Sequence, residues 1–98
     1  MGYFCYGGLD RFDFDDRVLT HLRAVILAKY NLQESLVFTW TFEGKQYSLW
    51  LHPTVPLRFE FDHEETPELN PLWKEQLMML ANSPGGLRLS DEPEAPQA

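Results

Sequence analysis

The stretch from Ser35 to His52, SLVFTWTFEGKQYSLWLH, constrains the fold more than any other part of the chain. Large apolar residues occupy every second position before Glu43-Gly44, and the alternation resumes after it. Alternation with a period of two is typical of a strand with one buried face, and glycine suits the positive φ of a tight turn. The stretch therefore predicts a β-hairpin that turns at Glu43-Gly44.

The position of the turn also predicts which residues face one another across the hairpin. The expected pairs on the apolar face are Trp40 with Tyr47, Phe38 with Leu49, and Leu36 with Leu51. A wholly apolar face must be covered, so we expect the rest of the chain to pack on it. The residues of the opposite, mostly polar face are Val37, Thr39, Thr41, Ser48, Trp50 and His52.

Trp50 is the one large aromatic residue on this polar face. In a sheet this small, we expect the second helix or the N-terminal strands to cover it. If it is exposed instead, then Trp50, with Val37 opposite and His52 nearby, forms a contact surface, because aromatic residues are enriched at interface hot spots.

The remaining elements follow from apolar spacing, caps and breakers. Two short strands flank Gly7-Gly8, and a strand covers residues 57–61. A first helix opens at Asp15-Asp16 and should stop near Asn31, which accepts a left-handed cap. A second helix opens at Asn70-Pro71, and a glycine-rich stop precedes a short last strand at residues 87–89. Positions off the apolar stripe of the first helix are Arg17, His21, Arg23 and Lys29.

This order of elements indicates the α+β class. We expect a small antiparallel sheet of about five to six strands, with two helices covering one face. Three consecutive strands after the first helix favour a meander. Residues 1–89 are expected to form a single domain, and residues 90–98 have the composition of a disordered acidic tail.

The charge and the cysteine count limit the partners and the compartment. The net charge is −7 over 98 residues, which disfavours unassisted nucleic-acid binding unless a local basic patch overrides it. Cys5 is the single cysteine, so no internal disulfide is possible, which suits the reducing cytoplasm. No apolar run approaches a membrane span. We therefore expect a cytoplasmic protein without a membrane contact.

Motifs that carry chemistry are scarce. Neither a GxxxxGK[ST] loop nor a GxGxxG loop occurs, and the histidines lack metal-ligand spacing, so we expect no cofactor and no metal site. The acidic run of residues 60–68 could bind a cation, but a solvated charged loop explains it equally well. A small enzyme built on Asp15, Asp16 or His52 is the least supported hypothesis, since no catalytic constellation is recognisable.

Several stretches resemble a family of roughly hundred-residue actinobacterial proteins that carry the label "ATP-dependent DNA ligase". The resemblance spans nearly all of residues 1–89, and its most specific pieces are FDDR at residues 14–17, WLHP at residues 50–53 and ANSPGGL at residues 81–87. A ligase of that class attaches AMP to the lysine of a KxDG motif in a much larger domain. The windows that follow Lys29, Lys45 and Lys74 do not match this motif.

Two functional hypotheses follow. The first is a non-enzymatic interaction module that meets a protein partner, or itself as a homodimer, through a sheet edge or the Trp50 face. The second, implied by the resemblance, is an accessory domain associated with a DNA ligase or another nucleic-acid transaction. Its phosphate contacts would be Arg17, Arg23 and Lys29, provided that the first helix turns them outward together.

Overall fold

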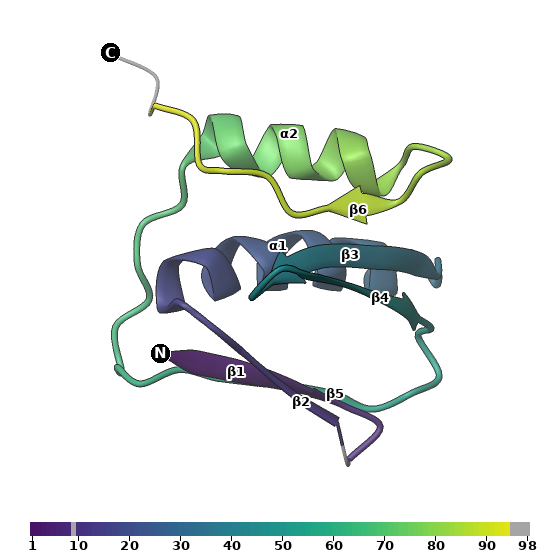
Figure 1. Cartoon of the computed structure of the whole chain (residues 1–98), viewed down its shortest axis with the longest axis horizontal. Coiled ribbons are helices and arrows are strands. Elements are labelled where there is room, and N and C mark those ends of the chain that lie inside the picture. Colours follow the sequence, from purple (N-terminus) through teal and green to yellow (C-terminus); the bar gives the residue numbers. More distant parts are fainter. Residues whose placement is uncertain (9, 95–98) are drawn as a thin grey trace.

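The computed structural model describes residues 1–8 and 10–94, which form an α+β fold as expected (Figure 1). The elements in chain order are β1 (Gly2–Tyr6), β2 (Asp10–Phe14), α1 (Asp16–Asn31), β3 (Leu36–Phe42), β4 (Lys45–Leu51), β5 (Leu57–Glu60), α2 (Pro71–Ala81) and β6 (Leu87–Arg88). The prediction of two helices and about six strands is therefore confirmed.

The strands divide into two small sheets. One has the order β2-β1-β5 and is antiparallel, and the other has the order β4-β3-β6, in which β6 runs parallel to β3. The predicted meander is wrong, because β5 pairs with β1 and not with β4. This pairing brings Phe59 opposite Phe4, with 5.9 Å between their ring centroids. Pairing with β1 thus lets the apolar face of β5 join an aromatic cluster.

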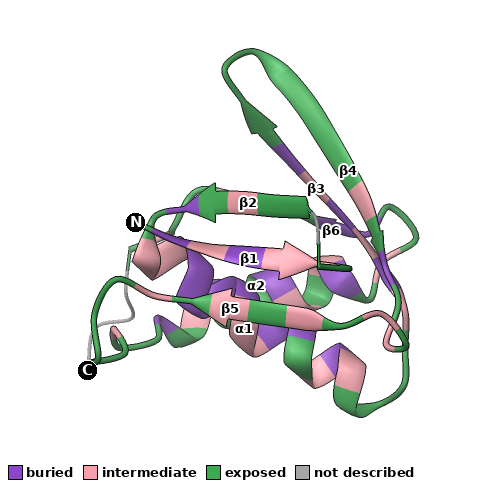
Figure 2. Cartoon of the chain, turned by 90° about the horizontal axis from the view of Figure 1, so that it is seen from below, coloured by how far each residue is buried: buried purple, intermediate pink, exposed green. Residues whose placement is uncertain are grey.

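The β3–β4 hairpin has the predicted register. Trp40 faces Tyr47, Phe38 faces Leu49, and Leu36 faces Leu51. The turn residues Glu43 and Gly44 have φ of 49° and 77°, as a two-residue turn that matches the twist of the strands requires. Figure 2 shows the hairpin rising away from the rest of the molecule.

Helix α1 lies between the sheet of β1, β2 and β5 and helix α2 (Figure 1). It begins after Asp15, whose carboxylate accepts a hydrogen bond from the Arg17 amide at 2.9 Å and caps the helix as predicted. His21 and Lys29 lie off the apolar stripe but are buried, because α2 covers a second side of the helix. The left-handed residue after α1 is Gln33, with φ of 60°, and not Asn31.

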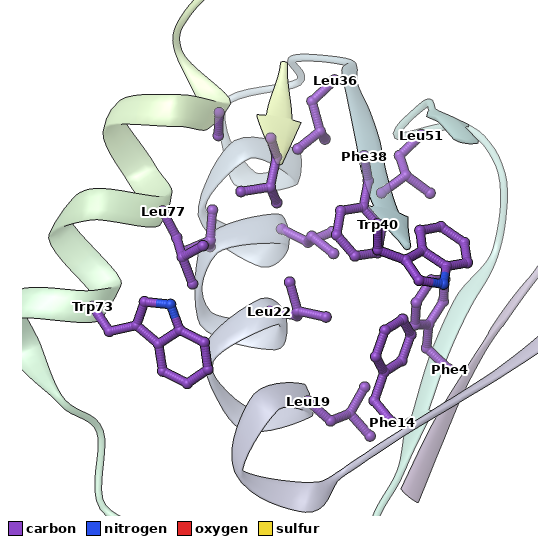
Figure 3. Packing of buried hydrophobic residues seen from close by; sticks show 14 residues of the cluster. Phe4, Phe14, Leu19, Leu22, Leu36, Phe38, Trp40, Leu51, Trp73 and Leu77 are labelled. Atoms are coloured by element: carbon purple, nitrogen blue, oxygen red, sulfur yellow. The ribbon is translucent and has the colours of Figure 1, made fainter. Parts of the chain in front are cut away.

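The core contains aliphatic residues of α1 with aromatic residues on both sides (Figure 3). Trp73 and Leu77 of α2 pack on one side, and Phe4, Phe14 and Trp40 of the strands pack on the other. Rings of the two sheets touch directly, since 5.6 Å separates the ring centroids of Phe14 and Trp40. The aromatic rings therefore join sheets that belong to separate hydrogen-bonded ladders.

Helix α2 opens as predicted. The Asn70 side chain accepts hydrogen bonds from the amides of Leu72 and Trp73, and Pro71 occupies the first turn. The Asn70 amide donates to Nε2 of the buried His21 at 2.8 Å, and Nδ1 of His21 donates to the Arg17 carbonyl at the same distance. The neutral imidazole thus joins the start of α2 to the first turn of α1.

The first part of the expected tail is bound to the body. Glu92 accepts hydrogen bonds from Arg17 Nε at 2.6 Å and Nη2 at 2.5 Å, and Asn70 Nδ2 donates to the Pro93 carbonyl at 2.9 Å. The indole of Trp73 donates to Ser90 Oγ at 3.3 Å. Ser90, Glu92 and Pro93 of the expected tail therefore contact α1 and the start of α2. Residues 95–98 of the predicted tail lie outside the described residues.

In the described part of the chain, no helix combines the length and the apolar character needed to cross a membrane.

We predict that Gly44→Ala lowers the free energy of unfolding by about 1 kcal/mol, since a side chain at positive φ strains the backbone. No atom lies within 4 Å of the position that a Cβ would take at Gly44, so the cost is conformational and not steric. Thermal unfolding should report a lower Tm, by about 5 °C.

The matched control is Gly85→Ala, where φ is not positive and the nearest atom lies 4.0 Å from the added Cβ. We expect this variant to keep the wild-type Tm. Equal losses in the two variants would contradict the assignment of the strain to the turn.

Candidate functional site

The outer half of the β3–β4 hairpin, residues 41–48, extends beyond the body (Figure 2), and we call it the hairpin tip. Strands of 7 residues reach about 23 Å, whereas the 5-residue strands β1 and β2 reach about 17 Å. Phe42 is therefore 58% exposed and Tyr47 38% exposed. The prediction that the whole apolar face is covered is wrong at this end, because the body is too short to reach it.

Trp50 is 63% exposed, so the expectation that other elements cover it is also wrong. Val37 lies opposite Trp50 as predicted and is half-buried. On the same face, the hydroxyls of Thr39 and Ser48 share a hydrogen bond at 2.8 Å. The hairpin thus presents aromatic side chains on both of its faces.

An aromatic cleft of about 320 Å³ lies between β2 and the apolar face of the hairpin. Phe12, Trp40, Phe42 and Tyr47 supply its aromatic lining. Trp40 is 7% exposed and packs edge-on against Phe12, while Tyr47 stacks on it with 5.4 Å between centroids. The exposed Tyr47 ring therefore packs on the buried Trp40 ring, and this stacking orients it.

Polar groups border the aromatic cleft. Arg11 and Asp13 of β2 form an ion pair at 3.0 Å, and the Arg11 guanidinium lies 3.8 Å from the centroid of the Tyr3 ring. Each charge at this border already has a partner within β1 and β2. Apolar contact is therefore what the cleft chiefly offers a ligand.

The Tyr6 side chain binds the main chain of β4 where the hairpin joins the body. Its hydroxyl donates to the Trp50 carbonyl at 2.8 Å and accepts a hydrogen bond from the His52 amide at 3.1 Å. No local sequence pattern predicts this contact, because it joins residues 44 and 46 positions apart. Tyr6 thereby fastens the root of the hairpin to the other sheet.

His52 lies just past the end of β4, and its imidazole forms hydrogen bonds within the turn that follows the strand. Nδ1 lies 2.7 Å from Thr54 Oγ1 and accepts a hydrogen bond from the Thr54 amide at 3.2 Å. Cys5 Sγ accepts a long contact from Arg58 Nη2 at 3.8 Å. Neither side chain forms a nucleophile–base pair among the hydrogen bonds of the described residues.

The three basic residues of α1 do not form a shared phosphate-binding surface. Arg17 bonds Glu92 and also donates from Nη1 to the Glu68 carbonyl at 3.1 Å. Arg23 lies 4.5 Å from the centroid of the Phe61 ring. Lys29 is buried and bonds Glu34 at 2.5 Å and Asn82 Oδ1 at 2.8 Å. The condition that the first helix turns these three cations outward together is therefore not met.

Over residues 1–8 and 10–94, no group of three His, Cys, Asp or Glu side chains has a metal-binding arrangement. The acidic loop after β5 is exposed, and Asp62 pairs with the amino group of Met1.

We predict that Glu92 makes the stability of the domain depend on pH in the acid range. Hydrogen bonds from Arg17 and then Asn70 lower the pKa of Glu92 from its ordinary value of 4.5 to about 2. A lowered pKa stabilises the fold above about pH 4.5, and this stabilisation disappears as the pH falls toward 2. Glu92→Gln should therefore lower Tm at neutral pH, and the difference from wild type should vanish near pH 2.

The control for this experiment is Glu75→Gln, which changes an exposed carboxylate of α2. Its Tm should follow that of the wild type at every pH. If Glu92→Gln followed the wild type in the same way, the bond between Arg17 and Glu92 would contribute nothing to stability in solution.

The comparisons with known proteins give a family without a function. The searches of curated proteins and of solved structures each returned no match. One family model, that of a domain of unknown function designated DUF7882, matches residues 1–92. This range includes the strap of residues 90–92 that binds Arg17, Asn70 and Trp73. The chain therefore belongs to the DUF7882 family.

Proposed function

We propose that this protein is a small non-enzymatic interaction module that meets a protein partner through the β3–β4 hairpin. The observation that carries the proposal is the exposure of Trp50, Phe42 and Tyr47, which are 63%, 58% and 38% exposed on one protruding element. Burying apolar surface is worth roughly 25 cal/mol per Å², and aromatic side chains dominate the energetics of interfaces. A partner that covers these three side chains would gain this energy.

The construction of the hairpin supports binding without much reordering. Phe38 is fully buried, and Trp40 nearly so, which anchors the root of β3 in the core. Tyr47 stacks on Trp40, and a hydrogen bond between hydroxyls joins Thr39 to Ser48. Side chains that are already ordered lose little entropy on association, so more of the contact energy appears as affinity.

The roles of the candidate catalytic residues support a module in preference to an enzyme. Asp15 caps α1, and Asp16 Oδ2 accepts a hydrogen bond from the Asp62 amide at 3.3 Å. His52 bonds Thr54 at the end of the hairpin. Each side chain has a local structural task that accounts for its position. We place the module in the cytoplasm, where its single Cys5 would stay reduced.

The accessory role that the resemblance to ligase-labelled proteins implies has less support. Arg17 forms an ion pair with Glu92, and Lys29 forms one with Glu34. Each ion pair would have to break before its cation could bind a phosphate. The net charge of −7 also repels a nucleic-acid backbone.

An affinity capture from host lysate at low and at moderate salt tests the proposal. We expect the wild type to retain a protein at moderate salt and Trp50→Ser to lose it, since an apolar contact resists salt. The matched variant is Met79→Ser, which removes a side chain of 68% exposure from α2, outside the hairpin. It should retain the partner.

Two outcomes would contradict the interaction module. One is equal capture by the wild type and both variants, which would place the contact outside the hairpin. The other is recovery of nucleic acid at low salt only, which is the signature of phosphate-driven binding and would favour the accessory role.

A further inference from the structure

The two sheets have four edge strands, and three of them are protected against pairing. Charged side chains stand on β2, at Asp10, Arg11 and Asp13, and on β5, at Arg58 and Glu60. Strand β6 has only 2 residues. Charges and short length are common devices that prevent edge-to-edge association. Strand β4 carries a charge only at its outer end, at Lys45, and residues 46–51 form an uncharged run without proline.

The register of the hairpin identifies the free groups of the β4 edge. Phe42 and Lys45 flank the two-residue turn, and such a pair exchanges its hydrogen bonds within the hairpin. Because the pattern alternates, Gln46, Ser48 and Trp50 direct their amides and carbonyls away from β3. The bond from the Tyr6 hydroxyl to the Trp50 carbonyl agrees with this direction. Tyr6 occupies the inner end, so Gln46 and Ser48 are left with both groups available.

We propose that the partner of this edge is a second copy of the chain, paired antiparallel through β4 with Tyr47 opposite its equivalent. This inference rests on the proposed interaction module and names its partner. In this register, each Gln46 faces Ser48 of the partner subunit and exchanges both main-chain hydrogen bonds with it. A register centred on Ser48 would need the Trp50 carbonyl, which already accepts the Tyr6 hydroxyl. The register centred on Tyr47 uses the groups that Tyr6 leaves free.

The side chains of the paired strands complement one another on both faces. On the apolar face, the two Tyr47 rings meet, and each continues the stack that begins at the buried Trp40. On the other face, Trp50 lies opposite Gly44 of the partner subunit, where an aromatic ring can cover a position without a side chain. The contact therefore covers the two most exposed rings of β4.

The charges at the contact itself do not oppose the pairing. Lys45 is the one charged residue of β4, and in this register it faces Leu49 of the partner subunit. The two Lys45 positions are offset by four residues along the strand, about 13 Å, which exceeds the screening length of about 10 Å at moderate salt. Repulsion between the acidic bodies is reduced because the contact is made by the protruding hairpins.

The first test is sedimentation velocity of the full chain over a range of concentrations. We expect the mass to rise from that of a monomer to twice that value for the wild type and for Ser48→Ala. Ser48→Pro should stay monomeric, because the main-chain group that proline removes is the outward amide, and the ladder with β3 stays intact. Ser48→Ala controls for the loss of the hydroxyl that bonds Thr39. Tyr47→Lys should also stay monomeric, since it places like charges opposite one another. Circular dichroism confirms that each variant is folded.

The second test reads the register directly. Directly opposed residues that are not hydrogen-bonded have Cα atoms about 4.5 Å apart, within the range that a disulfide spans. In a Cys5→Ser background, Tyr47→Cys should therefore form a covalent dimer on mild oxidation. Thr41→Cys, exposed on the same hairpin but on β3, should not.

The outcomes separate this inference from the proposal on which it rests. A wild type that stays monomeric at every concentration, or a Ser48→Pro variant that still dimerises, would overturn the β4 pairing. If the wild type then still captured a different protein from lysate and Trp50→Ser did not, the interaction module would stand with another partner. A monomer that also captures nothing through the hairpin would overturn both.

Discussion

The contact between aromatic rings of the two sheets is the interaction on which the rest of the structure depends. The sheets belong to separate ladders, and the rings of Phe4 and Phe14 meet Phe38 with centroids 6.2 Å and 6.0 Å away. A buried aromatic pair contributes about 0.5–1.5 kcal/mol beyond the area that it covers. Helix α1 closes this cluster from one side. The position of the hairpin on the body is thus decided by a few rings near its root.

The same arrangement explains why the outer half of the hairpin is free. Ring contacts extend along β3 from Phe38 to Trp40 and end with Tyr47, beyond which the body offers no further surface. Phe42 has the pattern of a buried residue but lies past this limit. A rigid root and an uncovered tip together give an ordered surface that costs little entropy to bind. The structural role of the hairpin and its proposed binding role therefore use different halves of one element.

The sequence was sufficient for what is local and insufficient for what joins distant residues. The hairpin register, the turn at Glu43-Gly44 and the caps at Asp15 and Asn70 each depend on neighbouring residues, and all were predicted correctly. The pairing of β5 with β1 was missed, because proximity along the chain favoured β4. The burial of His21 and Lys29 was missed for a similar reason, since it depends on α2. For the candidate site, the sequence singled out Trp50 but not the exposure of Tyr47, because alternation shows which face is apolar and not how far the body reaches.

Tyr6 blocks strand pairing at the inner end of the β4 edge and leaves the rest of that edge open. Its hydroxyl satisfies one carbonyl and one amide at the inner end of β4, and it thereby excludes registers that need those groups. Charged residues are spread along β2 and β5, whereas on β4 the charge is confined to Lys45 at the outer end, and the positions between Lys45 and the Tyr6 contact carry none. The side chains of Gln46 and Ser48 are polar, which suits exposure to water, and uncharged, so they do not repel another strand. The protection by Tyr6 ends at Trp50, and the uncharged positions beyond it surround the exposed Tyr47, which favours a strand edge that is available for pairing.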